Sequence, residues 1–455
     1  MSTIDLAAGR ATDAVVRSAA RIDADGRNGI WIEVLSLAER LAAAARVDAR
    51  LAAGASLPLA GLTLAVKGNI DVAGRRTTAG CPSYGELATV SAPVVVALEE
   101  AGAVVVGITN LDQFATGLVG TRSPHGVCPN AHWPDLVSGG SSSGSAVAVA
   151  AGLVDLSIGT DTAGSGRVPA AANGIVGVKP TRGWCPTVGV VPACRSLDCV
   201  SFFAADVETA ALAARLAGAA IDDPADGWRR RPAWPTPAAA VRVGFPDVTA
   251  LDFDGDASGP ERCAQAFDQV RAALAARATP VRTSTFDVDP FVRTGALLYD
   301  GAFVAERYDA VGAFVDRGSS DLDPVVAGII SRAADLPAWR VFHDLDELAR
   351  RRRATEPTWD DVDVIVVPSV PRVPTVADVE AEPIAVNSML GTYTNFVNLL
   401  DLAAVTVPVH GSDDSGAGGV GLGAGAAALP PFSVTLIGPA WSDELLAALG
   451  AAITK

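Results

Sequence analysis

Two short loops rich in glycine and serine are the segments of this 455-residue chain best suited to nucleophilic chemistry. Residues 138–145 read SGGSSSGS, and residues 159–167 read GTDTAGSGR. Such loops offer hydroxyl groups as nucleophiles and unhindered backbone N–H groups that stabilise an anion or a tetrahedral intermediate. A glycine/serine run is also typical of a flexible linker. Here both loops flank one apolar, helix-like segment at 146–153, so we interpret them as two walls of one site.

A serine nucleophile needs a base, and histidine is scarce in this chain. Only two of the four histidines follow the first loop, and Pro129 and Pro134 interrupt the strand that a G-x-S-x-G nucleophile elbow at 140–144 requires. Lys67 is the alternative base, because it follows the apolar, strand-like run 62–66. If that run carries the ammonium group into the interior, loss of hydration lowers its pKa until the neutral amine accepts a proton near pH 7. An ordinary surface lysine at a strand end is the competing interpretation.

The composition excludes several classes of partner. Lys plus Arg number 35 and Asp plus Glu 51, so the formal net charge is −16, and only 350–353 forms a basic run. A nucleic acid or a membrane is therefore a poor match, and no apolar stretch is long enough to span a bilayer. The six cysteines form no CxxC pair, and the sequence lacks metal-ligand, dinucleotide and phosphate-loop motifs, so we expect no metal and no cofactor. We expect a cytoplasmic protein with reduced thiols.

The elements that must position these groups alternate between helix and strand. Helical periodicity at 29–52 and 91–101 alternates with strand-like runs at 62–66 and 104–108. This alternation indicates an α/β fold whose sheet is largely covered by helices.

The pattern changes after residue 216, and we interpret 217–360 as a helical elaboration. Amphipathic helices are predicted there at 259–277, 292–314 and 338–354, strands then resume at 362–367, 404–409 and 432–437, and a last helix is predicted at 442–452. The expected organisation is an N-terminal helical segment (1–55), a core (56–216), the elaboration (217–360) and a return to the core sheet (361–455).

Three motifs resemble the amidase signature family in their order and spacing: AVKGNIDV around Lys67, GGSSSGSA at 139–146 and GTDTAGSGRVPAAANGIVGVKPTRG at 159–183. The resemblance implies that family's fold, a central mixed β-sheet covered by helices. It also implies a Ser–cisSer–Lys triad. In that triad Ser165 is the nucleophile, Ser141 is the bridging serine after a cis peptide bond, and Lys67 is the base.

Neighbouring residues take supporting roles by the same resemblance. Asp161 and Arg167 are interpreted as an ion pair or hydrogen-bonding groups that fix the second loop, and Ser142 as a hydrogen-bonding support of the triad. An oxyanion would be held by the backbone N–H groups of Thr162, Ala163, Gly164 and Ser165.

Two further stretches, TNLDQFATGLVGTRSP at 109–124 and LYDGAFVAERY at 298–308, resemble the allophanate hydrolase branch of the family. Allophanate is a small, planar, anionic acyl urea, and the planar fork of arginine matches its carboxylate. The resemblance assigns Tyr299 and Arg307 to substrate binding. Their eight-residue spacing, about two helical turns, predicts that both side chains project from nearly the same helix face. The alternative is a core tyrosine beside an arginine that pairs with Glu306 or another acidic neighbour.

Three functions stay open on this evidence. The first is the amidase domain of an allophanate hydrolase, which releases ammonia from urea-1-carboxylate through an acyl-enzyme. The second is another amidase-signature hydrolase of small amides or carbamates, or an amidotransferase-like subunit that acts on glutamine with partner proteins. The third is a non-catalytic binding protein, against which the intact Lys67, Ser141 and Ser165 argue. We expect a small anionic amide as the partner and count a homodimer among the options.

Overall fold

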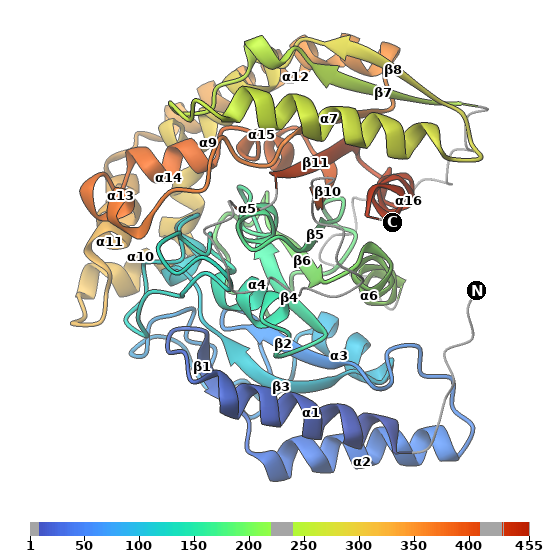
Figure 1. Ribbon diagram of the computed structural model, residues 1–455. Coiled ribbons are helices and arrows are strands. Elements are labelled where there is room, and N and C mark those ends of the chain that lie inside the picture. The colour runs from blue at the N-terminus through green and yellow to red at the C-terminus, as the bar shows by residue number, and fades with distance from the viewer. Residues whose placement is uncertain (1–8, 220–239, 410–429, 431, 455) are drawn as a thin grey trace.

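An eleven-stranded mixed β-sheet runs through the protein, with helices packed against it (Figure 1). The computed structural model describes residues 9–219, 240–409, 430 and 432–454. In order across the sheet the strands are β1 (Trp31–Val34), β3 (Val104–Thr109), β2 (Thr63–Lys67), β4 (Leu156–Asp161), β6 (Cys199–Ala204), β5 (Val176–Lys179), β10 (Leu402–Val409), β11 (Phe432–Pro439), β9 (Val364–Pro368), β7 (Val241–Pro246) and β8 (Val281–Phe286).

Parallel pairing is confined to two places in this sheet. β2 pairs in parallel with β3 and β4, and β7 pairs in parallel with β8 and β9. The strands between these groups, from β4 to β9, pair antiparallel. β2, β3 and β4 are buried along their whole length, which explains why their sequences are almost continuously apolar.

Helices cover the sheet and surround its ends. The described α-helices are α1 (Arg10–Asp25), α2 (Leu37–Ala52), α3 (Pro93–Glu100), α4 (Ser143–Ala150), α5 (Arg167–Ala172), α6 (Val207–Ala219), α7 (Gly259–Ala275), α8 (Asp289–Gly295), α9 (Leu297–Asp300), α10 (Ala305–Arg317), α11 (Pro324–Ser331), α12 (Ala338–Asp361), α13 (Val376–Ala381), α14 (Ala385–Leu390), α15 (Asn395–Leu399) and α16 (Asp443–Ile453). Across the described ranges, no helix is both long and apolar enough to cross a membrane.

Alternate residues of β2 belong to different cores on the two faces of the sheet. Leu64 and Val66 belong to a core that also contains apolar residues of α3, α6, α7 and α16. Ala65, which lies between them, packs instead with the apolar residues of α4. This alternation follows from the two-residue period of a strand, and it places α4 against β2 and β4.

Most predicted elements and the α/β class with a central mixed sheet are confirmed. The strand-like runs at 62–66, 104–108, 362–367, 404–409 and 432–437 correspond to β2, β3, β9, β10 and β11, and the last predicted helix corresponds to α16. The prediction of one helix over 29–52 is wrong, because Trp31–Val34 forms β1 against β3. The helix begins only after Ser36, whose side chain and that of Glu39 form a capping box.

The segment 217–360 is less helical than its periodicity predicts. It contributes β7 and β8, which extend the sheet beyond β9. The helix expected over 292–314 is interrupted, because Gly301 is extended (φ −96°, ψ −177°) between α9 and a short 3₁₀ turn that precedes α10. The division of the chain into four segments stays a prediction.

Candidate active site

Lys67 and Thr160 meet because β2 and β4 are parallel neighbours in the sheet. The carboxyl ends of such strands lie at the same edge, and these residues stand at those ends. Ser141 reaches the same place from the loop that leads into α4. Lys67 Nζ lies 2.8 Å from Ser141 Oγ and 2.8 Å from Thr160 Oγ1. The predicted base and bridging serine are therefore in direct contact.

The amine of Lys67 is held in the interior, with 0% of the residue exposed. Burial disfavours the charged form and lowers the pKa of Lys67 from 10.5 to about 7. The guanidinium of Arg307 lowers this pKa further, whereas three carboxylates raise it. Those carboxylates belong to Asp112, Asp161 and Asp198. The interpretation of Lys67 as a surface lysine is wrong, and its amine can accept a proton near neutral pH.

The loop after β3 fixes Ser141. The peptide bond between Gly140 and Ser141 is cis, and the Asp112 N–H donates to Ser141 O at 3.2 Å. A Cβ on Gly140 would lie 2.1 Å from Asp112 Oδ2, so only glycine fits there. The Asp112 carboxylate accepts hydrogen bonds from the backbone N–H groups of Val119, Gly120 and Arg122, at 3.2, 3.0 and 3.0 Å. Asp112 thereby ties the cis-serine to the segment 112–122.

Thr160 holds the amine from the other side. Its hydroxyl accepts hydrogen bonds from Lys67 Nζ at 2.8 Å and from Asn69 Nδ2 at 3.2 Å. Ser142 Oγ donates to Thr160 O at 3.1 Å and accepts from Thr160 N at 3.3 Å. Ser142 therefore reaches the predicted triad through the backbone of Thr160.

Ser165 lies in the turn between β4 and α5 and is 3% exposed. Its hydroxyl forms no hydrogen bond with any described residue, so the structure does not link Ser165 to Ser141 directly. The two glycine/serine loops do pack against each other. Ser142 Oγ of the first loop donates to Thr160 O of the second at 3.1 Å, and a Cβ on Gly159 would lie 2.6 Å from Ser142 Oγ. The loops are thus adjacent walls, as the sequence predicts.

Four successive backbone N–H groups of this turn have no acceptor among the described residues. Counting described residues alone, no hydrogen bond is formed by the N–H groups of Thr162, Ala163, Gly164 and Ser165. Gly164 has a φ of 140°, and a Cβ there would lie 2.3 Å from Thr394 Oγ1, so only glycine fits against the loop that precedes α15. A run of unpaired N–H groups in a buried turn is suited to bind an oxyanion.

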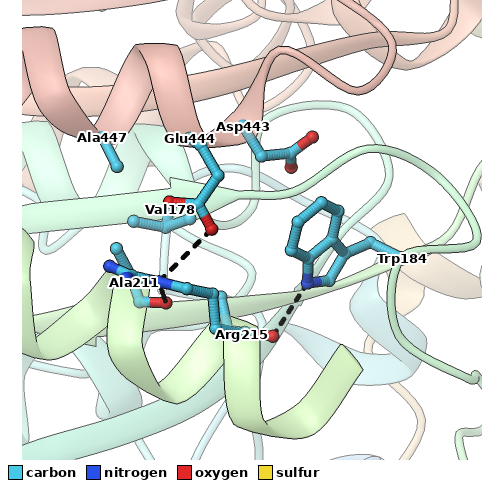
Figure 2. A pocket seen from close by; sticks show the side chains of 8 residues that line it. Val178, Trp184, Ala211, Arg215, Asp443, Glu444 and Ala447 are labelled. Atoms are coloured by element: carbon cyan, nitrogen blue, oxygen red, sulfur yellow. Dashed lines mark hydrogen bonds and ion pairs between the residues drawn. The ribbon is translucent and has the colours of Figure 1, made fainter. Parts of the chain in front are cut away.

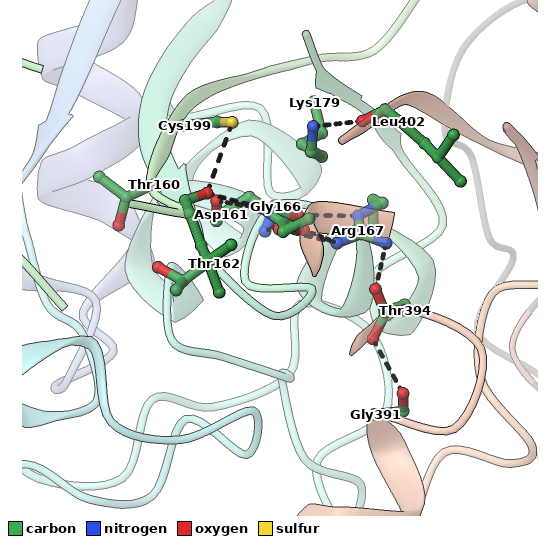
Figure 3. A network of polar contacts seen from close by, with 12 residues as sticks. Thr160, Asp161, Thr162, Gly166, Arg167, Lys179, Cys199, Gly391, Thr394 and Leu402 are labelled. Carbon is green, nitrogen blue, oxygen red and sulfur yellow. Dashed lines mark hydrogen bonds and ion pairs between the residues drawn. The ribbon is translucent and has the colours of Figure 1, made fainter. Parts of the chain in front are cut away.

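Figure 3 shows the charged pair Asp161–Arg167 beside this turn. Arg167 donates to both carboxylate oxygens of Asp161, at 2.9 and 2.8 Å, and both side chains are 0% exposed. Asp161 Oδ2 also accepts from Gly166 N at 3.0 Å. Arg167 reaches further, to Thr394 O and Asn398 Oδ1, each at 2.9 Å. The predicted ion pair is present, and it joins the turn to α15.

A second buried carboxylate, which sequence reasoning missed, holds the start of the turn. Asp198 accepts from Thr162 Oγ1 at 2.5 Å and from the backbone N–H groups of Ala193 and Cys194 at 3.0 and 3.1 Å. Burial raises the pKa of Asp198, whereas these donors and the positive charge of Arg307 lower it. Thr160 and Asp112 were missed as well. Asp112 and Thr160 lie inside the motifs at 109–124 and 159–183, but the role of each depends on folded-state contacts with other segments.

Tyr299 and Arg307 do not share a helix face, and that prediction is wrong. Tyr299 lies in α9 and Arg307 in α10, on either side of the extended Gly301. Tyr299 packs against an apolar cluster that includes Ala163 of the turn 162–165. Glu306 accepts hydrogen bonds from Ser196 N and Oγ, and Arg307 forms no ion pair in the described part of the chain. The alternative in which Arg307 pairs with Glu306 is therefore wrong.

Arg307 is 5% exposed and contacts the turn 114–116. Its Nη1 donates to Phe114 O, Ala115 O and Thr116 Oγ1, at 3.4, 3.2 and 2.8 Å. Its Nε and Nη2 form no hydrogen bond to any residue that the structure describes. The guanidinium is thus attached by one nitrogen and keeps two donor groups for another ligand.

A small cavity elsewhere in the molecule plays no part in this arrangement. It has a volume of about 20 Å³ and lies between α6 and α16, beside the Arg215–Glu444 ion pair and Trp184 (Figure 2). That volume holds about one water molecule. None of the predicted site residues lines it.

Comparison with known proteins identifies the family of this chain. A family model described as Amidase matches residues 13–447. The urea amidolyase of Saccharomyces cerevisiae is 42% identical over 397 residues, which cover 86% of this chain and 20% of that protein. One subunit of the glutamyl-tRNA(Gln) amidotransferase of Natronomonas pharaonis is 31% identical over 428 residues, covering 87% of this chain and 96% of that protein. A solved structure of Kluyveromyces lactis allophanate hydrolase superposes with a TM-score of 0.84 at 37% identity, covering 97% of this chain and 70% of that one.

The fold and the comparisons together define a hydrolase that acts on amides. The chain belongs to the amidase family, as its motifs predict, and it is similar to allophanate hydrolase and to urea amidolyase. It spans about a fifth of the length of the urea amidolyases that it matches.

Replacing Lys67 by methionine, which has a similar length and no charge, is expected to remove the cost of burying the lysine amine, a cost that decreases as the pH rises. The pKa of Lys67 is about 7 in the folded protein against 10.5 in the unfolded chain. Between these values the unfolded chain binds more protons, so the wild-type free energy of unfolding rises with pH by about 1.4 kcal/mol per unit. The free energy of unfolding of Lys67→Met minus that of wild type should therefore fall by about 1.4 kcal/mol for each pH unit between these values. Urea unfolding at a series of pH values measures it.

Lys179, the other buried lysine, is present in both proteins, so its contribution cancels. If the difference in free energy of unfolding between the two proteins stays constant from about pH 7.5 to pH 9.5, the low pKa of Lys67 is contradicted.

Proposed function

We propose that this chain hydrolyses the terminal amide of allophanate, urea-1-carboxylate, and releases ammonia. The observation that carries the proposal is the buried guanidinium of Arg307, attached through Nη1 alone among the described contacts. In a chain with a net charge of −16, one such fork supplies the local positive charge that an anionic acyl urea requires. The similarity to the allophanate hydrolase of Kluyveromyces lactis supports the same substrate. Tyr299, packed beside Ala163, is proposed as the second binding residue.

Acylation of Ser165 is the first proposed step. Ser165 Oγ attacks the carbonyl carbon of the terminal amide while its proton passes to Ser141, whose own proton passes to the neutral amine of Lys67. The tetrahedral oxyanion accepts hydrogen bonds from the unpaired N–H groups of the turn 162–165. Lys67 then returns a proton through Ser141 to the departing nitrogen, so that ammonia leaves and an acyl-enzyme forms. The low pKa of Lys67 and its contact with Ser141 support this route.

Hydrolysis of the acyl-enzyme completes the proposed reaction. Water attacks the ester carbon, and its proton passes through Ser141 to Lys67. Collapse of the second tetrahedral intermediate breaks the bond to Ser165 Oγ, which takes back a proton from Lys67 through Ser141, and frees N-carboxycarbamate. These steps use only side chains, backbone N–H groups and water. The homodimer and the cytoplasmic location stay predictions.

A second candidate is an amidotransferase-like subunit that acts on glutamine. It is supported by the 31% identity with the amidotransferase subunit of Natronomonas pharaonis, which this chain matches over 96% of that protein's length. Glutamine carries an ammonium group as well as a carboxylate, so it needs an acidic partner in addition to a cation. The substrate comparison below separates the two candidates.

Ammonia release from allophanate, malonamate, biuret, glutamine and a neutral aryl amide tests the proposal. Biuret is the sharpest comparison, because it resembles allophanate in size and planarity but is neutral. We expect kcat/KM for allophanate to exceed that for biuret by at least about 100-fold, since the buried charge of Arg307 favours the anion. The Ser165→Ala variant should lose roughly 1000-fold or more in kcat/KM with its free energy of unfolding within about 1 kcal/mol of wild type.

Preferential release from glutamine would favour the amidotransferase-like function. Equal rates on allophanate and biuret would contradict the proposed specificity for an anion. Full activity in Ser165→Ala would show that Ser165 is not the nucleophile.

Replacing Arg307 by alanine is expected to raise the KM for allophanate by at least about 30-fold, because truncating one partner of a buried charge pair costs several kcal/mol. Arg317→Ala is the matched control, since Arg317 is an exposed arginine at the other end of α10. Steady-state kinetics of both variants measure the effect. An Arg307→Ala enzyme with the KM of the control would remove Arg307 from the substrate site.

A further inference from the structure

The contacts of Arg307 converge on one short turn. Phe114 O and Ala115 O accept at 3.4 and 3.2 Å, which are long for hydrogen bonds, whereas Thr116 Oγ1 accepts at 2.8 Å. Thr116 is 0% exposed. The strongest contact of this guanidinium is therefore with a single buried hydroxyl group.

The hydroxyl of Thr116 has one proton and two lone pairs, and the structure accounts for the proton. Thr116 Oγ1 donates to Phe114 O at 3.2 Å, which leaves its lone pairs for Arg307 Nη1. The backbone of the same residue is fixed as well, because Arg122 Nη1 donates to Thr116 O at 3.1 Å. Both the hydroxyl and the backbone of Thr116 are thus held by contacts other than the one with Arg307.

The turn itself has an uncommon backbone. Phe114 and Ala115 have φ values of 50° and 52°, in the left-handed region that residues with a side chain rarely occupy. Such conformations persist only where the surrounding structure fixes them, and they concentrate at functional sites. Here Gln113 N donates to Arg122 O at 2.8 Å, and the Asp112 carboxylate binds the N–H of Arg122. The segment that fixes Ser141 also fixes this turn.

We propose that Thr116 determines substrate specificity as a positioning residue for Arg307, an inference that rests on the proposed function. A guanidinium reads a carboxylate through two N–H groups in one plane, so its orientation decides whether both hydrogen bonds form. The Thr116 hydroxyl engages Nη1 and leaves Nε and Nη2 for the substrate carboxylate. Without that hydroxyl the long side chain of Arg307 keeps its charge and loses its fixed orientation.

The test compares Thr116→Val, which removes the hydroxyl at nearly constant size, with Thr116→Ser, which keeps it. The readout is the ratio of kcat/KM for allophanate to that for biuret. This ratio is expected to fall roughly tenfold in Thr116→Val, the value of one hydrogen bond to a charged group, and less than about threefold in Thr116→Ser. Thr355→Val is the control, because Thr355 is a buried threonine of α12 whose hydroxyl donates to Arg352 O in its own helix.

A double-mutant cycle with Arg307→Ala decides whether Thr116 acts through Arg307. In the Arg307→Ala background, Thr116→Val should leave the allophanate-to-biuret ratio unaltered within about twofold. An unchanged ratio in Thr116→Val alone, or an equal fall in both backgrounds, would overturn the inference. If Arg307→Ala itself leaves the allophanate-to-biuret ratio unchanged, the proposed allophanate specificity is wrong too. If Arg307→Ala lowers the ratio and Thr116→Val does not, only the inference about Thr116 is wrong. Thr116→Ala supplies the same comparison if Thr116→Val does not fold.

Discussion

Burial of the Lys67 amine is the constraint on which the rest of the site depends. Loss of hydration lowers the pKa of this lysine, whereas three nearby carboxylates raise it. Each of those carboxylates has its own donors: Asp161 has Arg167, Asp112 has three backbone N–H groups, and Asp198 has Thr162 with two N–H groups. None of them forms an ion pair with Lys67 among the contacts described. The amine instead contacts two hydroxyl groups, Ser141 and Thr160, which favour neither charge state strongly.

The same contacts join the base to the segment that holds Arg307. The segment 112–122 binds Ser141 through the Asp112 N–H and accepts Arg307 through the turn 114–116. The bridging serine and the residue proposed to bind the substrate carboxylate are therefore positioned by one stretch of chain. Lys67 and Thr160 come from β2 and β4, which are interior strands of the sheet and are buried along their whole length. A strongly acidic protein can in this way present one positive group to a small anion.

The sequence predicts the strands, and the contact between Lys67 and Ser141, better than it predicts the residues that support them. Apolar runs mark β2 and β3 because both faces of the sheet are covered, and the glycine/serine loops mark turns whose backbone lies too close to neighbouring residues for a side chain. Helical periodicity gives the wrong prediction at 31–34, which pairs with β3 as an edge strand of the sheet. It also fails at Gly301, whose extended backbone interrupts the predicted helix. In both places pairing and packing override the local pattern. Asp198 and Thr116 could not be predicted, since a buried carboxylate or hydroxyl acquires its role from partners far away in the chain.

The most direct test of the account is the titration of Lys67 itself. The chain contains three lysines, Lys67, Lys179 and Lys455, so NMR of protein labelled with ¹⁵N and ¹³C in lysine gives few signals, and the spectrum of Lys67→Met assigns the one that matters. The account predicts that the Lys67 signal titrates with a pKa of about 7, because burial disfavours its charged form. A Lys67 signal that stays protonated up to pH values near 10, as in an ordinary lysine, would contradict it.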